Sequence, residues 1–309
     1  MKILISGTTG FIGRYLIAQN FSDVEYVYVT RSRSLMNKNN YFHISDLSKE
    51  TNWDGAFKGI DSIIHLAGLA HSQLFSVSDY QSVNVQGTLK FAIGAAKSGV
   101  KRFVFVSTIG VNGSSTKDDP FTINSIETPQ NPYTQSKFDA ELGLKKIAAD
   151  TGMELVIVRP TLVYGPNAPG NFGLLTSLIN RLPFLPFSFV NNKRDFIAVQ
   201  NLTDLLITCA VHPDAAGHIF LASDGEVVSI KEFTDAIAQG LGKKLFQLPV
   251  PIFLMRLGAK FLGKSDVVNQ LVGNLQVDSS NIQEVLEWSP PYTMKQAMAF
   301  LSEDKVECK

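Results

Sequence analysis

The sequence predicts an α/β fold: a doubly wound parallel sheet followed by a smaller C-terminal α/β domain. Short apolar runs rich in β-branched residues recur along the first half of the chain, and helical patterns fill the gaps between them. A glycine-rich turn follows the first run directly, as expected where a buried strand leads into a helix. The expected strands are Ile3–Ser6, Val24–Val29, Ile63–Ala67, Phe103–Ser107 and Leu155–Arg159.

The turn, Gly7-Thr8-Thr9-Gly10-Phe11-Ile12-Gly13, lies between the first strand and an amphipathic segment over Phe11–Asn20. Glycines at this spacing let the backbone turn tightly and approach a pyrophosphate at the N-terminus of the next helix. The spacing differs from the commoner Gly-x-Gly-x-x-Gly fingerprint, and a plain turn is the alternative. Its place between a strand and a helix favours a dinucleotide site.

Two long helical patterns follow, Val77–Lys97 and Tyr133–Asp150. Beyond residue 160 the chain changes to irregular segments rich in Pro, Asn and Phe, at Gly165–Gly173 and Leu182–Asn192. We therefore expect a dinucleotide-binding domain over 1–165 and a smaller substrate domain over 166–309, with some segments of the second returning to the first sheet. Further helices are expected near Asn201–Val211, Ile230–Leu241, Pro251–Leu262 and Ser279–Leu286.

Composition narrows the class of ligand and the compartment. The 309 residues include 28 basic and 28 acidic side chains, so no net field favours nucleic acid as a partner. No apolar run is long enough to span a bilayer, and the strand-like start leaves no room for a signal peptide, so we expect a cytoplasmic protein without stable membrane insertion. Cys209 and Cys308 are the only cysteines, and no His/Cys cluster has metal-ligand spacing, so no metal is expected.

Tyr133 and Lys137 stand four residues apart at the start of a predicted helix, which puts both side chains on one face. A nearby ammonium lowers the pKa of a phenol, so Tyr133 is a candidate to exchange a proton with a sugar hydroxyl or ketone. Lys137 is also a candidate to bind a ribose hydroxyl. The alternative is a surface pair on an amphipathic helix.

Ser107 and Thr108 end a buried strand at the carboxyl edge of the sheet, where the Tyr133 helix should also begin. A hydroxyl in that position is suited to hydrogen-bond the reacting oxygen. The alternative is a pair that only caps nearby backbone.

Together, the glycine turn, the strand-end hydroxyls and Tyr-x-x-x-Lys resemble the short-chain dehydrogenase/reductase superfamily, and more narrowly its extended nucleotide-sugar epimerase/dehydratase type, which has a Rossmann-type fold. The resemblance runs nearly end to end. It implies that Thr108, Tyr133 and Lys137 are catalytic, with Ser107 as the alternative to Thr108. It implies cofactor contacts from Tyr133 and Lys137 and from Gly7, Thr9, Gly10, Phe11, Ile12, Gly13, Asp46, Leu47, Leu66, Ala67, Gly68, Asn84, Pro160 and Leu162.

For the substrate, the resemblance implies that Arg194 and Asn171 bind the diphosphate of a UDP-sugar and that Thr108 contacts the sugar. Arg194 has a simpler alternative, which is to pair with Asp195 or a neighbouring carboxylate, but its planar fork of donors suits a diphosphate. The second C-terminal arginine that many epimerases carry has no counterpart that we can place near Val267–Val277.

Other residues of the motifs also have structural alternatives. Asp46 is able to cap a helix beginning near Leu47, and Asn84 is able to bond backbone within its own helix. For His65 and His71 we prefer the interpretation as satisfied polar residues over a catalytic base.

Two departures from the family pattern bear on the reaction. Dehydratases carry Asp and Glu after the strand-end Thr, whereas this chain has Ile109 and Gly110, so dehydration is disfavoured. The second strand leads into Arg31 and Arg33 instead of an acidic residue, which favours NADP(H) over the alternative, NAD(H). A basic surface loop is the structural alternative.

Asn112 stands where typical epimerases carry Tyr, and with Leu182–Asn192 and Val277-Asp278-Ser279-Ser280 it resembles bacterial enzymes of surface polysaccharide synthesis. The resemblance favours a 4-ketoreductase of UDP-4-keto-6-deoxy-N-acetylhexosamine. The alternative is a UDP-glucose or UDP-N-acetylglucosamine 4-epimerase, and an alternative of another class is a non-catalytic NADP-binding sensor. The family also implies a homodimer through the helices at Val77–Lys97 and Tyr133–Asp150.

Two apolar segments of the second domain have open interpretations. Leu182–Phe189 is either a wall beside a nucleobase or core packing. Pro251–Leu262 combines large apolar residues with Arg256, Lys260 and Lys264, so it is either a helix on a membrane surface or a core helix. We expect the core helix, because amphipathic helices commonly pack soluble domains.

Overall fold

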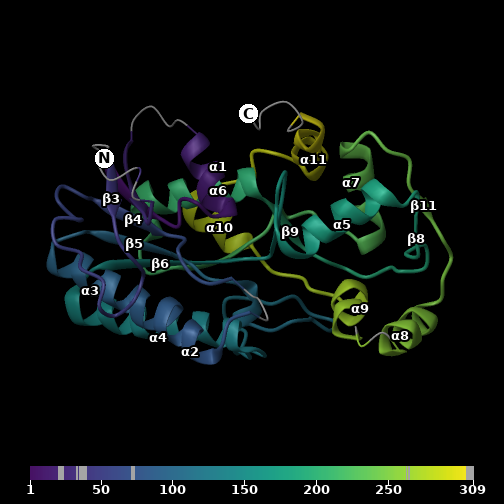
Figure 1. Cartoon of the computed structure of the whole chain (residues 1–309), viewed down its shortest axis with the longest axis horizontal. Coiled ribbons are helices and arrows are strands. Elements are labelled where there is room, and N and C mark those ends of the chain that lie inside the picture. The colour runs from purple at the N-terminus through teal and green to yellow at the C-terminus, as the bar shows by residue number, and fades with distance from the viewer. Residues whose placement is uncertain are drawn as a thin grey trace.

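The computed structural model of the chain describes residues 1–19, 24–32, 34, 40–70, 74–261, 263 and 265–303. At its centre is a seven-stranded sheet, traced within these residues, in which all neighbouring strands are parallel (Figure 1). Its order is β10-β6-β5-β4-β1-β2-β3. The strands are β1 Lys2–Ser6, β2 Glu25–Thr30, β3 Tyr41–His43, β4 Ser62–His65, β5 Arg102–Val106, β6 Glu154–Pro160 and β10 Ile219–Ala222.

Alternate residues of each central strand enter two separate cores, because successive side chains of a strand point to opposite faces. Ile3 and Ile5 of β1 join one core with α1 (Phe11–Ala18), α6 (Val199–Val211) and α10 (Ser280–Leu286). Leu4 joins the other with α3 (Thr88–Lys97) and α4 (Pro132–Thr151). The sheet is thus covered by helices on both faces, which confirms the predicted doubly wound class (Figure 1).

The expected helix over Val77–Lys97 is continuous but not uniformly α-helical. It consists of α2 (Val77–Tyr80), a π-helical segment (Gln81–Gly87) and α3. Ser76 and Asp79 form a capping box that fixes its start. The π-helical turns carry Asn84, which lies beside the loop after β4.

The helix predicted over Tyr133–Asp150 is α4, and its ends follow from local sequence. Asn131 caps its N-terminus by accepting a hydrogen bond from the Thr134 N–H, and Pro132 occupies the first turn, where no donor is lost. Gly152 ends the helix in the left-handed conformation, with φ 74°. These signals place Tyr133 in the first turn of α4, at the carboxyl edge of the sheet.

The second half of the chain forms its own core and also returns to the sheet. Tyr164, Phe172, Phe196 and Phe233 lie together in this core. β10, α6 and α10 instead pack with the central sheet. The other elements are β7 Leu162–Tyr164, α5 Gly170–Arg181, β8 Phe184–Leu185, β9 Phe196–Ala198, α7 Ile230–Gly240, β11 Phe246–Gln247, α8 Ile252–Phe261, α9 Ser265–Val272 and α11 Met294–Glu303.

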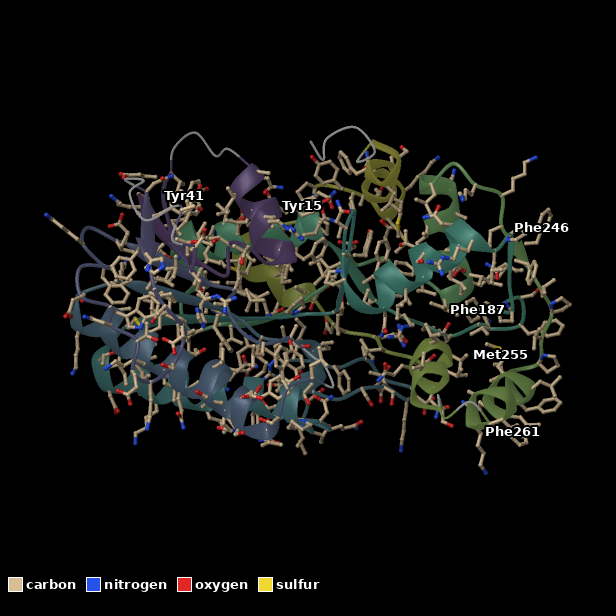
Figure 2. The ribbon with its side chains drawn as sticks, in the orientation of Figure 1. Tyr15, Tyr41, Phe187, Phe246, Met255 and Phe261 are labelled. Atoms are coloured by element: carbon tan, nitrogen blue, oxygen red, sulfur yellow. The ribbon has the colours of Figure 1, made fainter. Side chains whose placement is uncertain are left out.

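The helix expected as a core element at Pro251–Leu262 packs against the core by one face only, through Ile252 and Met255. Of the α8 side chains, Phe253, Leu254, Leu257 and Phe261 are exposed, and only Ala259 is classed as buried. Figure 2 shows Phe261 at the end of the molecule opposite β3. Helical periodicity predicted the helix but not what covers its apolar face. Nowhere in the described ranges is a helix long and apolar enough to cross a membrane.

Candidate functional site

The glycine turn forms a tight cradle between β1 and α1. Gly7 has φ +79°, and a Cβ at this position would lie 2.6 Å from the backbone nitrogen of Ala67. A Cβ at Gly13 would lie 2.3 Å from the Gly7 carbonyl oxygen, so helix and turn pack backbone to backbone. Gly10 precedes α1 without a side-chain cap, which leaves the first N–H groups of the helix suited to a phosphate. This backbone fits a dinucleotide.

A cavity of about 380 Å³, here called the first cavity, opens beside this turn. Arg31 lines it from the end of β2, and Asp46 and Leu47 line it from the loop after β3. Of the residues predicted to contact the cofactor, those lining it are Gly7, Thr9, Gly10, Arg31, Asp46, Leu47, Leu66, Ala67 and Gly68. Arg33 and His71 lie outside the described residues.

Several predicted cofactor residues do not line the first cavity. Phe11 and Ile12 open α1 and pack against the apolar cores, and Pro160 is buried in β6. Asn84 Oδ1 accepts a hydrogen bond of 2.7 Å from the Leu69 N–H, and its Nδ2 donates to the Leu69 carbonyl at 3.0 Å. The same Nδ2 donates to Ser136 Oγ at 3.0 Å, so Asn84 ties the loop after β4 to α4.

A second cavity, of about 330 Å³, is lined by residues that follow the carboxyl ends of β5 and β6 and by residues of the second half of the chain. Thr108 and Tyr133 line it from one side, and Asn171 and Arg194 line it from the other. Leu162, predicted as a cofactor contact, also lines this cavity. The fold thus brings together residues that are distant in sequence and that the motifs had singled out separately.

Thr108 and Ser107 point to different surroundings. The Thr108 hydroxyl accepts a hydrogen bond of 3.2 Å from the Gly110 N–H and is adjacent to the second cavity. The Ser107 hydroxyl donates to the buried carboxylate of Glu141 and lines neither cavity. The geometry therefore favours Thr108 over Ser107 as the hydroxyl available to a ligand.

The Lys137 ammonium contacts the end of β5. Its Nζ donates to the Val106 carbonyl at 2.8 Å and lies 4.6 Å from the centroid of the Phe105 ring. Burial lowers the pKa of Lys137 to about 8, against the opposing charge of Glu141. The side chain is nearly buried, at 6 % exposure.

Burial, with a smaller contribution from Tyr80, raises the pKa of Tyr133 to about 12. The two tyrosine rings lie 6.1 Å apart between centroids. The net shift is opposite to the lowering expected from a nearby ammonium, and desolvation is its largest cause. Tyr133 is a neutral phenol here, poised as a proton donor.

Arg194 is a buried cation on the wall of the second cavity, at 9 % exposure. Its Nη1 donates to the carbonyls of Gln270 and Gly273, at 2.5 and 2.9 Å. Burial lowers the pKa of Arg194 to about 10. Its expected alternative, a pair with Asp195, is not formed, since Asp195 accepts from the Val277 N–H. Within the described residues no carboxylate lies within ion-pair distance of Arg194, so an anionic ligand would supply its counter-charge.

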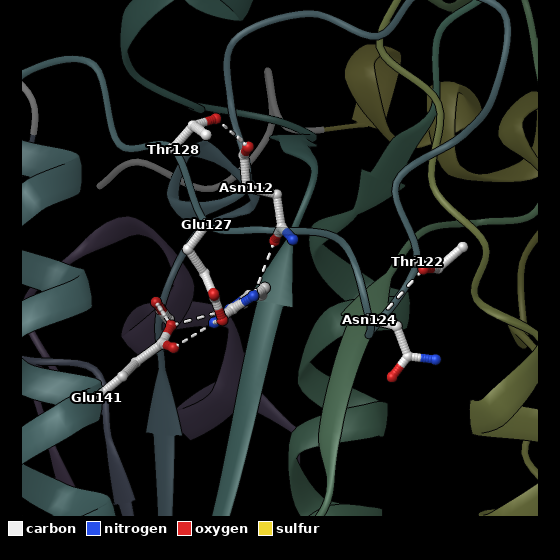
Figure 3. Close-up of polar contacts among 8 residues, drawn as sticks. Asn112, Thr122, Asn124, Glu127, Thr128 and Glu141 are labelled. Carbon is white, nitrogen blue, oxygen red and sulfur yellow. Dashed lines mark hydrogen bonds and ion pairs between the residues drawn. The ribbon is translucent and has the colours of Figure 1, made fainter.

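The sequence reasoning missed a buried ionic cluster behind the site. Arg159 is fully buried and binds Glu141 through Nη2–Oε2 at 2.5 Å and Nε–Oε1 at 3.0 Å. It also donates to Asn112 Oδ1 at 2.9 Å and to Glu127 Oε1 at 3.0 Å (Figure 3). The cluster fixes the strand-end turn against α4. Arg159 and Asn112 were visible only as parts of motifs, and nothing in the sequence paired them with Glu141.

His65 is enclosed in the sheet and does not reach either cavity. Its Nδ1 lies 2.6 Å from Ser6 Oγ and its Nε2 lies 2.9 Å from Thr88 Oγ1. Burial, and then Lys137, lower the pKa of His65 to about 3, so the ring is neutral. This agrees with the preferred interpretation as a satisfied polar residue. Across the described residues, no group of three or more His, Cys, Asp or Glu has the geometry of a metal site.

Comparison with known proteins gives concordant results. A UDP-glucose 4-epimerase of Vibrio cholerae is 40 % identical over 313 residues, covering 97 % of this chain and 95 % of that protein. The N-acetyl-alpha-D-glucosaminyl-diphospho-ditrans,octacis-undecaprenol 4-epimerase of Escherichia coli O157:H7 is 25 % identical over 316 residues, covering 96 % of this chain and 93 % of that protein.

Among solved structures, the UDP-N-acetylglucosamine 4-epimerase of Bacillus cereus superposes with a TM-score of 0.77 at 21 % identity, covering 98 % of both chains. That likeness is one of fold. Residues 3–223 match the NAD dependent epimerase/dehydratase family, which agrees with the resemblance drawn from the motifs. The chain therefore belongs to the NAD dependent epimerase/dehydratase family and is an enzyme of that family.

Proposed function

We propose that this enzyme inverts the configuration at C4 of a UDP-linked hexose or N-acetylhexosamine. The observation that carries the proposal is that Thr108, Tyr133 and Arg194 line one cavity of about 330 Å³. Two relatives that cover nearly the whole chain are both named as 4-epimerases. These relatives support epimerisation better than the 4-ketoreductase that the sequence first favoured.

The first cavity and the glycine cradle fit an NAD(P) dinucleotide. The cradle leaves no room for a Cβ at Gly7 or Gly13, and the first N–H groups of α1 face outward without a side-chain cap. Asp46 and Leu47 would lie against the adenine end. When bound, the nicotinamide supplies hydride acceptance and return at a sugar carbon.

The residues of the second cavity would handle the proton and the diphosphate. Tyr133 would donate a proton as phenol when the ketone is reduced. To accept the C4 hydroxyl proton when the alcohol is oxidised it must first be a phenolate, which a positive charge of the bound oxidised cofactor would favour. Thr108 would hydrogen-bond the same oxygen and hold it near Tyr133. Arg194 and Asn171 would hold the diphosphate, and the negative charge would neutralise the buried guanidinium.

In the first half of a turnover C4 gives up a hydride and its hydroxyl oxygen gives up a proton; in the second half the hydride returns to the opposite face of C4 and the proton returns to the oxygen. No reducing equivalent is consumed. The sugar ring must turn within the cavity between the two half-reactions, while the diphosphate stays on Arg194.

A second candidate, the NADPH-dependent 4-ketoreductase of UDP-4-keto-6-deoxy-N-acetylhexosamine, is favoured by one specific observation. β2 ends at Thr30, and the next residue, Arg31, lines the first cavity where an acidic residue would suit the ribose of NAD. A guanidinium there is suited to a 2′-phosphate. The same Thr108, Tyr133 and Lys137 would serve a reduction.

Two parallel incubations followed by NMR separate these functions. With UDP-glucose or UDP-N-acetylglucosamine and no added cofactor, an epimerase yields the C4-inverted sugar. With the UDP-4-keto-6-deoxy sugar and NADPH, a reductase consumes one NADPH for each alcohol formed. Tyr133→Phe should slow either conversion by about 10²–10⁴-fold. Tyr80→Phe, in the ring that packs against Tyr133, is the matched control and should retain activity.

If the purified protein binds NADPH but converts neither substrate, the non-catalytic sensor is the better description. The homodimer expected through the helices at Val77–Lys97 and Tyr133–Asp150 stays a prediction. Ile93 and Leu142 are exposed on these two helices, at 41 % and 49 %, and would lie in such an interface.

A further inference from the structure

The second half of the chain presents an apolar surface that neither cavity uses. On α8, Phe253 is 67 % exposed and Phe261 is 83 % exposed, and Leu254 and Leu257 are nearly half exposed. Phe246 of β11, 64 % exposed, lies at the same end of the molecule (Figure 2). Large apolar side chains gathered on one surface are unusual for a protein that meets only water.

The four α8 residues form one narrow stripe. At about 100° per residue, Phe253, Leu254, Leu257 and Phe261 fall within an arc of about 100° on the helix. Met255 and Ile252 lie on the other side and pack against the core. The helix is therefore anchored by one face and presents the other outward.

Positive charge borders this stripe. On the same helical projection, Arg256 and Lys260 lie beside the arc, about 20–60° from its edge, and both are exposed. Residues 236–265 contain no Asp or Glu in a chain whose net charge is zero. The basic residues of this stretch are Lys243, Lys244, Arg256, Lys260 and Lys264.

We infer that α8 docks this enzyme onto an anionic membrane surface, with its apolar stripe at the level of the headgroups and acyl chains. An apolar face flanked by Lys and Arg is the pattern of a helix that lies in the plane of a bilayer surface. Ten residues make a helix of about 15 Å, too short to span a bilayer, so the contact is peripheral. Arg256 and Lys260 meet the anionic lipid headgroups.

A second copy of the chain fits this surface less well. A two-fold interface would bring the same patch of each subunit together, so Arg256 and Lys260 of both copies would face one another. Asp235 and Asp266 bound this stretch, but residues 236–265 themselves hold no carboxylate to neutralise the two cations. An anionic bilayer matches both the apolar stripe and its charge.

Docking through α8 would set the substrate cavity close to the membrane. α8 is followed directly by α9, whose Gln270 and Leu271 line the second cavity. The Gln270 carbonyl accepts a hydrogen bond from Arg194. One helix therefore separates the membrane-facing stripe from the cation proposed to hold the diphosphate.

The test is sedimentation of the full-length protein with vesicles of phosphatidylcholine, with or without about 30 mol % phosphatidylglycerol. We expect co-sedimentation with the anionic vesicles, at least tenfold weaker on pure phosphatidylcholine and reduced by salt of about 0.5 M. Phe253→Ser/Phe261→Ser should lose binding and keep catalytic activity. Val77→Ser/Ile126→Ser, which changes two apolar residues exposed at 61 % and 82 % elsewhere, is the matched control and should bind as the wild type does.

Arg256→Glu/Lys260→Glu leaves the apolar stripe intact and provides a second variant if the serine variant fails to fold. It should lose the preference for anionic vesicles. The inference is overturned if the wild type stays in the supernatant, or if folded variants of both kinds bind as strongly as the wild type. It is also overturned if the wild type ignores vesicles and the serine substitutions convert a dimer into a monomer, since a second copy then covers α8.

Discussion

Arg159 and Glu141 form an ion pair between β6 and α4 in which both side chains are completely buried, with 2.5 Å between Nη2 and Oε2. Neither residue lines the cavities, yet Glu141 also accepts from Ser107, the neighbour of Thr108. The pair thus joins the strand that ends at the site to the helix that carries Tyr133 and Lys137.

Glu141→Gln should lower the free energy of unfolding by about 3–5 kcal/mol, because the buried Arg159 would keep only its pair with the partly exposed Glu127. Chemical denaturation measures this. Lys2→Met is the control: its pair with Glu25 is accessible to solvent, with the two side chains 30 % and 68 % exposed, so a change within about 1 kcal/mol is expected. A double substitution, Glu141→Met/Arg159→Met, should recover part of the loss because no fully buried unpaired charge remains, Glu127 being partly exposed. Equal effects of Glu141→Gln and Lys2→Met would contradict this account.

The buried lysine predicts a dependence of stability on pH. Burial lowers the pKa of Lys137 from 10.5 to about 8, so between these values the unfolded chain holds a proton that the folded protein has released. The free energy of unfolding should therefore rise between about pH 8 and pH 10, as deprotonation relieves the cost of burying the charged lysine. Below about pH 8 this group should add no pH dependence.

Lys137→Met should remove that rise, and Lys146→Met, at an exposed position on the same helix, should keep it. Urea denaturation across this pH range is the measurement. A wild-type curve whose slope matches that of Lys137→Met would show that the lysine is not desolvated.

Arg194→Met should weaken the binding of UDP by about 10- to 100-fold, the usual effect of losing a hydrogen bond to a charged group. Isothermal titration calorimetry with UDP checks this directly, without turnover. Lys193→Met is the matched control, because it removes an adjacent positive charge that is exposed and does not line the cavity. If both variants bind UDP alike, the cation acts only through its bonds to the Gln270 and Gly273 carbonyls.

Arg31→Ala should weaken NADPH binding by about tenfold and leave NADH binding nearly unchanged, if the guanidinium meets a 2′-phosphate. Fluorescence titration with the two reduced cofactors measures the ratio. Arg14→Ala removes an exposed arginine of α1 that does not line the first cavity and should change neither affinity. Parallel losses for both cofactors would argue that Arg31 contributes general attraction and no selectivity for NADP(H).

The sequence predicted the sheet well where strands are buried on both faces. β5 and β6 read as continuous apolar runs and were placed within one or two residues. β3, with three partly buried residues, carries too short a signal, and the helix α5 was hidden within a glycine-rich stretch expected to be irregular. The fold class therefore followed from the long central elements.

Part of the candidate site was also accessible from sequence, and part was not. The resemblance to the family joined Thr108, Tyr133 and Arg194 in one hypothetical site. In the fold these three residues line one cavity. The pKa values were beyond reach, because the burial of Tyr133 and Lys137 depends on residues from several elements. The Arg159 cluster needed tertiary contacts for the same reason.

The π-helical segment Gln81–Gly87 changes which face of the helix at Val77–Lys97 points toward the sheet. An added residue within a helical turn rotates everything after it by about 100°. Within the π-helical turns, Ser82 and Val83 line the first cavity; after them, Phe91 and Ala92 enter the core beneath the sheet. Deleting one residue here would restore ordinary α-helical geometry. Ser82 and Val83 could then no longer line the cavity while Phe91 and Ala92 stay in the core. The π-helical turns therefore allow one continuous helix to contact the cavity at one point and the core at another.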